Sequence, residues 1–215
     1  MPEENLELDH VLIVVADLAE AGREIEERYG LASIEGGRHP GWGTANRIVP
    51  LGETYLELIA VVDEDEAAQS PFGTWVARGT RPALAQPLGW AVRTRALDDV
   101  AGRLGLEVSS NSRPTGDGRV LRWRLAGVEA ATADPSLPIL IEWGEGTPVP
   151  GRSPISHPAG PMELTKLHLA GDADRVADWL GDHDLPIEVK PGTPAVTKIV
   201  LSGTAGEAIL EGERP

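Results

Sequence analysis

The chain of 215 residues is long enough to bury a sizeable core, and its 41% hydrophobic and 25% charged residues are typical of a folded protein rather than a disordered one. Its net charge of −15 repels both a nucleic-acid backbone and an anionic membrane, so neither is an expected partner. It has no cysteine, which excludes disulfides and thiolate metal sites. The first residues are acidic where a secretory signal would be basic, and no apolar run approaches the roughly 18 residues that span a bilayer, so we expect a cytoplasmic protein.

One pattern occurs three times along the chain. Segments that begin at Leu8, Leu88 and Leu164 each open with a short apolar strand, turn, and continue into a helix with apolar residues three and four apart. A glycine stands where each helix is expected to stop, and three strand-like runs separated by turn residues follow. The pattern predicts an α+β fold of three βαβββ modules. Because one module leaves an apolar sheet face open, we expect modules to pair into a curved sheet around a cleft.

The pattern also predicts where the modules begin and end. The first covers residues 1–63, the second 87–146 and the third 162–215. Residues 64–86 are expected to be a linker with room for one helix, and residues 147–161 a crossover that is rich in proline and glycine and therefore irregular. An odd number of units that tend to pair favours a homodimer.

Residues that carry chemistry recur at equivalent positions of the three modules. The first strands align His10, Trp90 and Lys166, and the last strands align the acids Glu57, Glu142 and Glu211. An acid within an apolar strand costs free energy unless it is paired or coordinated. Glu57, which has leucine on both sides, therefore indicates a functional site. Glu211, near the end of the sequence, is more typical of a solvent-facing residue on an alternating strand.

The block from Gly36 to Asn46 is a second candidate for the site. Its glycines allow a close approach of the backbone to a ligand. Its polar and aromatic side chains are candidates for substrate binding: Arg38, Trp42, Thr44 and Asn46. His39 is a candidate general acid–base group near neutral pH. The alternative is a tight connection between strands whose histidine and tryptophan pack against the sheet.

These motifs carry a resemblance to a known family. A βαβββ repeat with Asp-His-Val on its first strand and Leu-Glu-Leu on its fourth resembles the vicinal oxygen chelate superfamily, which contains glyoxalase I, extradiol dioxygenases, fosfomycin-resistance enzymes and bleomycin-binding proteins. The run GGRHPGWGTANRIVPLGETYLELIAV is similar to the glyoxalase-like domain proteins of this superfamily. The resemblance implies paired modules that form a U-shaped cleft, which commonly holds a divalent metal.

The resemblance also implies a set of metal ligands. Carried over position by position, they fall on His10, Glu57, Trp90 and Glu142, and Trp90 cannot ligate a cation. The remaining histidine and two glutamates have donors for Mn, Mg, Zn or Ni, with waters completing the shell. The competing interpretation is a metal-free pocket in which Trp90 stacks on an organic ligand.

Two functions therefore stay open. In the first, a metal or the His10–Glu57 pair polarises a small carbonyl or vicinal-oxygen compound while Glu142 or His39 moves a proton, as an isomerase or lyase would. In the second, the protein binds or sequesters a small molecule without turnover, and its net charge favours a cationic ligand. The candidate ligands favour the first function, and the missing fourth ligand favours the second.

Overall fold

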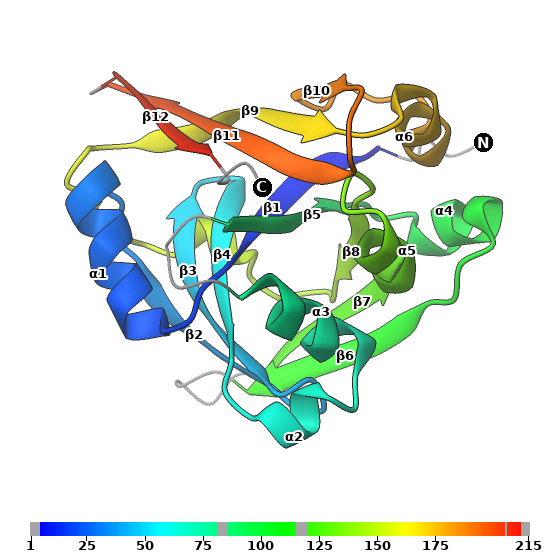
Figure 1. Ribbon diagram of the computed structural model, residues 1–215, viewed down its shortest axis with the longest axis horizontal. Helices are drawn as coiled ribbons and strands as arrows, with labels where there is room; N and C mark the ends of the chain where they lie inside the picture. Colours follow the sequence, from blue (N-terminus) through cyan, green and yellow to red (C-terminus); the bar gives the residue numbers. More distant parts are fainter. Residues whose placement is uncertain (1–4, 81–85, 115–119, 205, 212–215) are drawn as a thin grey trace.

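A computed structural model describes residues 5–80, 86–114, 120–204 and 206–211, and within them the chain forms two β-sheets with helices packed around them (Figure 1). The elements of the first module are β1 (Glu7–Val14), α1 (Leu18–Tyr29), β2 (Ile34–His39), β3 (Thr44–Leu51) and β4 (Thr54–Val61). The short helices α2 (Glu64–Ala67) and α3 (Pro71–Gly79) follow. The elements of the second module are β5 (Gln86–Arg93), α4 (Leu97–Leu104), β6 (Ser109–Pro114), β7 (Val120–Ala126), α5 (Val128–Ala133) and β8 (Ile139–Trp143).

The first two modules build one eight-stranded sheet in the order β2-β3-β4-β1-β5-β8-β7-β6. In each module the first strand runs parallel to the fourth, and the two first strands, β1 and β5, pair antiparallel at the centre. The sheet curves until its edge strands β2 and β6 are in contact, and there Arg113 on β6 donates a hydrogen bond from Nη1 to the carbonyl oxygen of Gly36 on β2 at 2.9 Å. The predicted paired modules and curved sheet are confirmed.

Alternation along β1 sorts its side chains between two cores. Val11 and Ile13 point to the outer face of the sheet, where they belong to the larger hydrophobic cluster. Leu12 and Val14 point to the inner face, into a second cluster that includes Phe72 and other residues of α3. The inner face is therefore the one that the curvature encloses, and it is where a cleft can form.

The last part of the chain forms a separate four-stranded sheet. After the 3₁₀ turn η1 (Pro150–Arg152) come β9 (Met162–Ala170), α6 (Ala173–Leu180), β10 (Ile187–Lys190), β11 (Ala195–Gly203) and β12 (Gly206–Glu211). The element order β-α-β-β-β is the predicted one, but the strand order β10-β9-β11-β12 places β9 between β10 and β11 rather than beside the last strand. This sheet packs on the outer face of the large sheet, over β3, β4 and β5, and away from the inner face (Figure 1).

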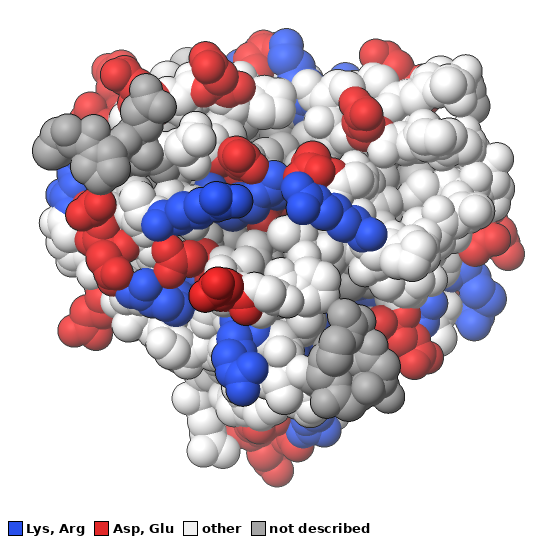
Figure 2. Space-filling view, turned by 180° about the vertical axis from the view of Figure 1, so that it is seen from behind, with Lys and Arg blue, Asp and Glu red and all other residues white. Residues whose placement is uncertain are grey.

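The surface agrees with the composition. On the face seen in Figure 2, lysine and arginine side chains form a short band with acidic side chains on both sides, so the described residues present no extended basic surface there. Within the described ranges, no helix has the length and apolar character needed to cross a membrane. The homodimer stays a prediction.

Candidate functional site

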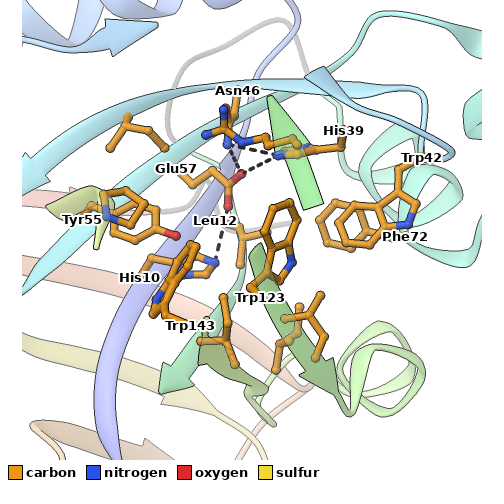
Figure 3. A pocket seen from close by; sticks show the side chains of 16 residues that line it. His10, Leu12, His39, Trp42, Asn46, Tyr55, Glu57, Phe72, Trp123 and Trp143 are labelled. Carbon is orange, nitrogen blue, oxygen red and sulfur yellow. Dashed lines mark hydrogen bonds and ion pairs between the residues drawn. The ribbon is translucent and has the colours of Figure 1, made fainter. Parts of the chain in front are cut away.

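The inner face of the curved sheet encloses a small pocket that is open to solvent on one side. One wall is polar and is built by His10, His39, Asn46, Tyr55, Glu57 and Arg113. The remaining walls are apolar and aromatic, with Trp42, Phe72, Trp123 and Trp143 among their residues (Figure 3). A concave, mostly apolar site with a few convergent polar groups has the form of a small-molecule site.

His10 is held at this wall by the residue before it. A β-bulge between Leu8 and His10 interrupts the pairing of β1 with β5, so Asp9 and His10 do not simply alternate between the two faces. Nδ1 of His10 lies 2.6 Å from Oδ1 of the fully buried Asp9, and the ring stacks on Tyr55 with centroids 4.6 Å apart. Since the carboxylate accepts the Nδ1 proton, Nε2 of His10 is left to face the pocket.

The electrostatics of His10 are set by two carboxylates. Its Nε2 lies 3.4 Å from Oε2 of Glu57, and both side chains are more than 90% buried. Burial lowers the pKa of His10, but the hydrogen bond and charge of Asp9, together with the charge of Glu57, outweigh it and raise the pKa above its ordinary value. The arrangement therefore favours a protonated imidazolium beside Glu57.

Glu57 is fixed from the opposite side by the second candidate block. Nδ2 of Asn46 donates to Oε1 of Glu57 at 2.5 Å, while Oδ1 of Asn46 accepts a hydrogen bond from the backbone N–H of Gly37 at 2.9 Å. The amide orientation is thus determined, and Glu57 is presented between Asn46 and His10 (Figure 3).

His39 has the opposite character to His10. Burial lowers its pKa to about 4, even though the charge of Glu57 raises it. Its Nδ1 lies 3.0 Å from Oγ1 of Thr44 and its Nε2 lies 3.3 Å from Nδ2 of Asn46. A neutral ring that donates from Nδ1 and accepts at Nε2 satisfies both contacts, so the surroundings shift the pKa values of the two histidines of this pocket in opposite directions.

Arg113 brings a positive charge from the second module to the polar wall. Its side chain is 5% exposed, and burial lowers its pKa although the charge of Glu57 raises it. Gly37 makes room for it, because a Cβ on Gly37 would lie 2.3 Å from Nη1 of Arg113. Gly36 makes room in the same way for Asn46, whose Oδ1 would lie 1.9 Å from a Cβ there.

Five of the sequence-predicted residues meet in this pocket: His10, His39, Trp42, Asn46 and Glu57. Thr44 is buried behind His39 and orients it. Arg38 lies outside, where it pairs with Asp63 and Glu66.

Two further predicted residues, Trp90 and Glu142, are placed away from the pocket. Trp90 points to the outer face, is fully buried, and donates from Nε1 to the carbonyl oxygen of Ser136 at 3.1 Å, so the expected stacking on a pocket ligand is not available to it. Glu142 forms an ion pair with Arg124 at 2.8 Å and lines a groove on the outside. The aligned residues of the third module, Lys166 and Glu211, are exposed and pair with Glu188 and Lys198.

The donor set does not fit the metal site that the resemblance implies. His10 and Glu57 lie together, but Glu142 lies outside the pocket with its carboxylate paired to Arg124. Across the part of the chain that the structure describes, no group of three or more His, Cys, Asp or Glu side chains is arranged to hold a metal ion. We therefore derive no chemical step through a metal.

Other residues of the site were missed by sequence reasoning. Asp9 stands in the Asp-His-Val motif, but strand alternation places it on the face opposite to His10, and the bulge that brings them together has no signal in the sequence. Tyr55 occupies the same strand face as Glu57 and was recognisable by its spacing of two. Arg113 and Trp143 come from the second module, and no local pattern connects them to the pocket.

The curved sheet of paired βαβββ modules around an enclosed pocket is the architecture of the vicinal oxygen chelate superfamily. The chain belongs to the glyoxalase-like domain family of that superfamily, whose family model matches residues 8–183. Among the curated proteins no match to the chain is found.

The chain is similar to several solved structures. A hypothetical protein from Staphylococcus aureus is 14% identical, with a TM-score of 0.67, over 97% of this chain and 99% of its own. At that identity the likeness shows the fold alone. Methylmalonyl-CoA epimerase from Mycobacterium tuberculosis is 22% identical over 63% of this chain and 85% of its own, with a TM-score of 0.42. A variant of the Streptomyces coelicolor epimerase is 18% identical over 66% and 96%, with a TM-score of 0.45.

Proposed function

We propose that this protein is an isomerase or lyase that moves a proton on a small, largely apolar carbonyl compound. The observation that carries the proposal is the pair formed by His10 and Glu57 in the pocket wall, with Nε2 and Oε2 3.4 Å apart and His10 backed by Asp9. A buried acid and a buried base that face the same space are the equipment for general acid–base catalysis.

The two groups have complementary roles. His10, whose pKa is raised, carries a proton on Nε2 and donates it to the carbonyl oxygen of the bound compound. Glu57, as a carboxylate, takes the proton from the neighbouring carbon, so an enol forms while the C–H bond breaks. Return of a proton to a carbon and of the enol proton to His10 restores both groups and gives the isomer. The positive charge of Arg113 stabilises the developing negative charge in the same low-dielectric space.

The apolar lining restricts the compound to one with an apolar body. Trp42 and Phe72 lie with ring centroids 4.7 Å apart, and Trp123 and Trp143 with centroids 6.2 Å apart, in the lining of the pocket. These aromatic walls equally favour a second function, binding without turnover, because they recognise a ligand and take no part in proton transfer.

The test is hydrogen exchange in D₂O with a panel of small aliphatic and aromatic aldehydes, ketones and thioesters. We expect the protein to accelerate deuterium uptake at the carbon next to the carbonyl of at least one compound, as NMR detects it. His10→Gln and Glu57→Gln should each reduce that rate by roughly 100-fold or more. Glu142→Gln, a matched change in an acid outside the pocket, should leave it unchanged.

The same panel separates the two functions. A compound that changes the tryptophan fluorescence of the protein, but gains no deuterium, would favour the binding function over catalysis. Exchange that survives in both His10→Gln and Glu57→Gln would overturn the assignment of the acid–base pair.

A further inference from the structure

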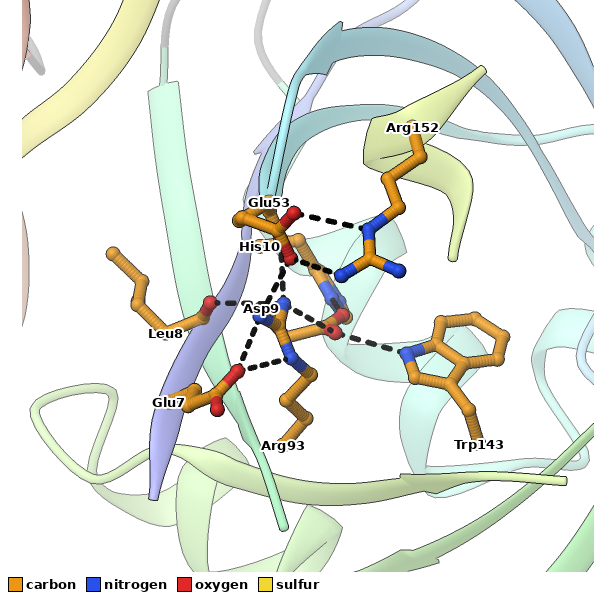
Figure 4. A network of polar contacts seen from close by, with 8 residues as sticks. All are labelled: Glu7, Leu8, Asp9, His10, Glu53, Arg93, Trp143 and Arg152. Atoms are coloured by element: carbon orange, nitrogen blue, oxygen red, sulfur yellow. Dashed lines mark hydrogen bonds and ion pairs between the residues drawn. The ribbon is translucent and has the colours of Figure 1, made fainter. Parts of the chain in front are cut away.

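Asp9 is a buried carboxylate whose second oxygen faces away from His10. While Oδ1 accepts from His10, Oδ2 accepts a hydrogen bond from Nε1 of Trp143 at 2.9 Å and lies 3.7 Å from Nη1 of Arg93 (Figure 4). A fully buried carboxylate is stable only when such donors surround it. These two residues, together with Tyr55, which also has a side-chain hydrogen bond with Asp9, hold the Asp9 carboxylate in place and, through it, orient the ring of His10.

Arg93 is itself fixed at the surface. Its Nε donates to Oε2 of Glu7 at 2.8 Å and its Nη1 donates to the carbonyl oxygen of Glu53 at 2.5 Å. Arg152 holds the Glu53 side chain with two hydrogen bonds, of 3.0 and 2.6 Å. A continuous polar network thus runs from an outside groove, lined by Arg93, Trp143 and Arg152, to the buried Asp9.

Trp143 connects the two modules. It lies on β8 of the second module and lines both the inner pocket and the outside groove, while Asp9 lies on β1 of the first. Its indole therefore stands between solvent and the Asp9–His10 pair. The second module contributes no acid–base group of the proposed pair, but it supplies the N–H that fixes the carboxylate behind it.

We propose that Trp143 and Arg93 are positioning residues for His10: they lock the Asp9 carboxylate so that His10 keeps its proton on Nδ1 and aims Nε2 at Glu57. This role rests on the proposed function, in which Nε2 is the proton donor. Under this proposal, residues of the second module orient His10, which belongs to the first module.

The experiment uses the free protein with ¹⁵N-labelled histidine, so that it needs no substrate. At a pH above the pKa of His10, where the ring is neutral, its nitrogen shifts report which nitrogen carries the proton, and the proton shared with Asp9 gives a downfield signal. We expect the Nδ1–H tautomer and that signal in the unchanged protein. Trp143→Phe keeps the ring and removes the N–H, and should shift the tautomer ratio by on the order of tenfold, the value of a hydrogen bond to a charged group.

Two further variants complete the test. Trp179→Phe is the matched control, because Trp179 lies on α6 and packs against the outer hydrophobic cluster, outside the pocket, and the same change there should leave the His10 signals unchanged. Arg93→Gln should shift them in the same direction as Trp143→Phe, and carries the test if Trp143→Phe does not fold. Signals of His10 that stay unchanged in every folded Trp143 and Arg93 variant would overturn the positioning role.

The tautomer measurement and the deuterium-exchange measurement can fail separately. If the tautomer shifts but no compound exchanges deuterium, the network positions His10 for another role. If exchange occurs and the tautomer does not shift, the acid–base pair stands and the positioning proposal fails.

Discussion

Glu57 lies against His10 with 3.4 Å between Oε2 and Nε2, in surroundings that leave both side chains less than 10% exposed. A histidine so buried would lose its proton readily if it were alone, since desolvation penalises the charged form. The pKa of His10 is therefore raised by its interactions with Asp9 and Glu57, whereas burial of the ring alone would lower it.

Glu57→Gln should accordingly lower the pKa of His10, because it removes a negative charge at nearly constant size. Since a raised folded-state pKa gives stability that is full below the unfolded value near 6.5 and lost as the pH rises through the folded pKa, the variant should lose less stability between pH 6 and pH 8 than the unchanged protein. An NMR titration of His10 and urea unfolding at the two pH values check this. Glu142→Gln is the control, and an equal shift in that variant would contradict the local explanation.

For His39 we expect the opposite dependence of the unfolding free energy on pH. Its pKa of about 4 in the folded protein lies below that of an unfolded histidine, so the unfolded chain binds the extra proton and stability falls as the pH drops from about 7 toward 4. His39→Gln should remove about 1 kcal/mol of the loss in unfolding free energy between pH 7.5 and pH 5.5. Urea unfolding at both pH values gives the difference, and a variant that loses as much as the unchanged protein would show that His39 is not the responsible group.

Much of the fold was predictable because its signals are local. Alternating apolar residues, helix stops at glycine and the repetition of the unit all act within one module, and the strands and helices of the two paired modules follow them. The third segment has the same local pattern but a different strand order. Its strands pack against the outer face of the large sheet, and such long-range contacts decide which strands become neighbours. The periodicity of the sequence does not report them.

The site was predictable to the same extent and for the same reason. His10, Glu57, His39 and Asn46 lie on neighbouring strands of one module, so a motif within about 50 residues captures them. Trp90 and Glu142 were aligned by position in the repeat, yet they lie outside the pocket, on the outer face and in the outside groove. The position of a residue in the repeat does not determine which face of the sheet its side chain occupies. A single bulge, such as the one at Asp9, changes the alternation of side chains between the two faces.

The placement of Glu142 gives a prediction about metal binding. Its carboxylate pairs with Arg124 on the outside of the sheet, so it is not positioned to share a metal with His10. Glu142→Ala should leave the divalent-metal content of the purified protein unchanged after incubation with Mn, Ni, Zn or Mg, as elemental analysis measures it. Glu57→Ala serves as the comparison within the pocket. A stoichiometric ion lost specifically in Glu142→Ala would contradict the observed placement and restore Glu142 as a ligand.

The paired glycines of β2 give the last prediction. A Cβ on Gly36 would meet Oδ1 of Asn46 at 1.9 Å, and the side chain of Asn46 has no room to retreat without losing its bonds to Gly37 and Glu57. Gly36→Ala should therefore cost about 1–3 kcal/mol of unfolding free energy, as overpacking in a core does, and should also displace Glu57. Gly102 in α4 is the matched control, because a Cβ there meets nothing within 4 Å.

In that exposed helical position Gly102→Ala should stabilise the protein by up to about 1 kcal/mol, the difference in helix propensity between the two residues. Thermal and urea unfolding of the two variants compare the same chemical change in two surroundings. If Gly36→Ala were as stable as the unchanged protein, Asn46 would not be locked between Gly37 and Glu57, and the geometry that holds Glu57 toward His10 would need another cause.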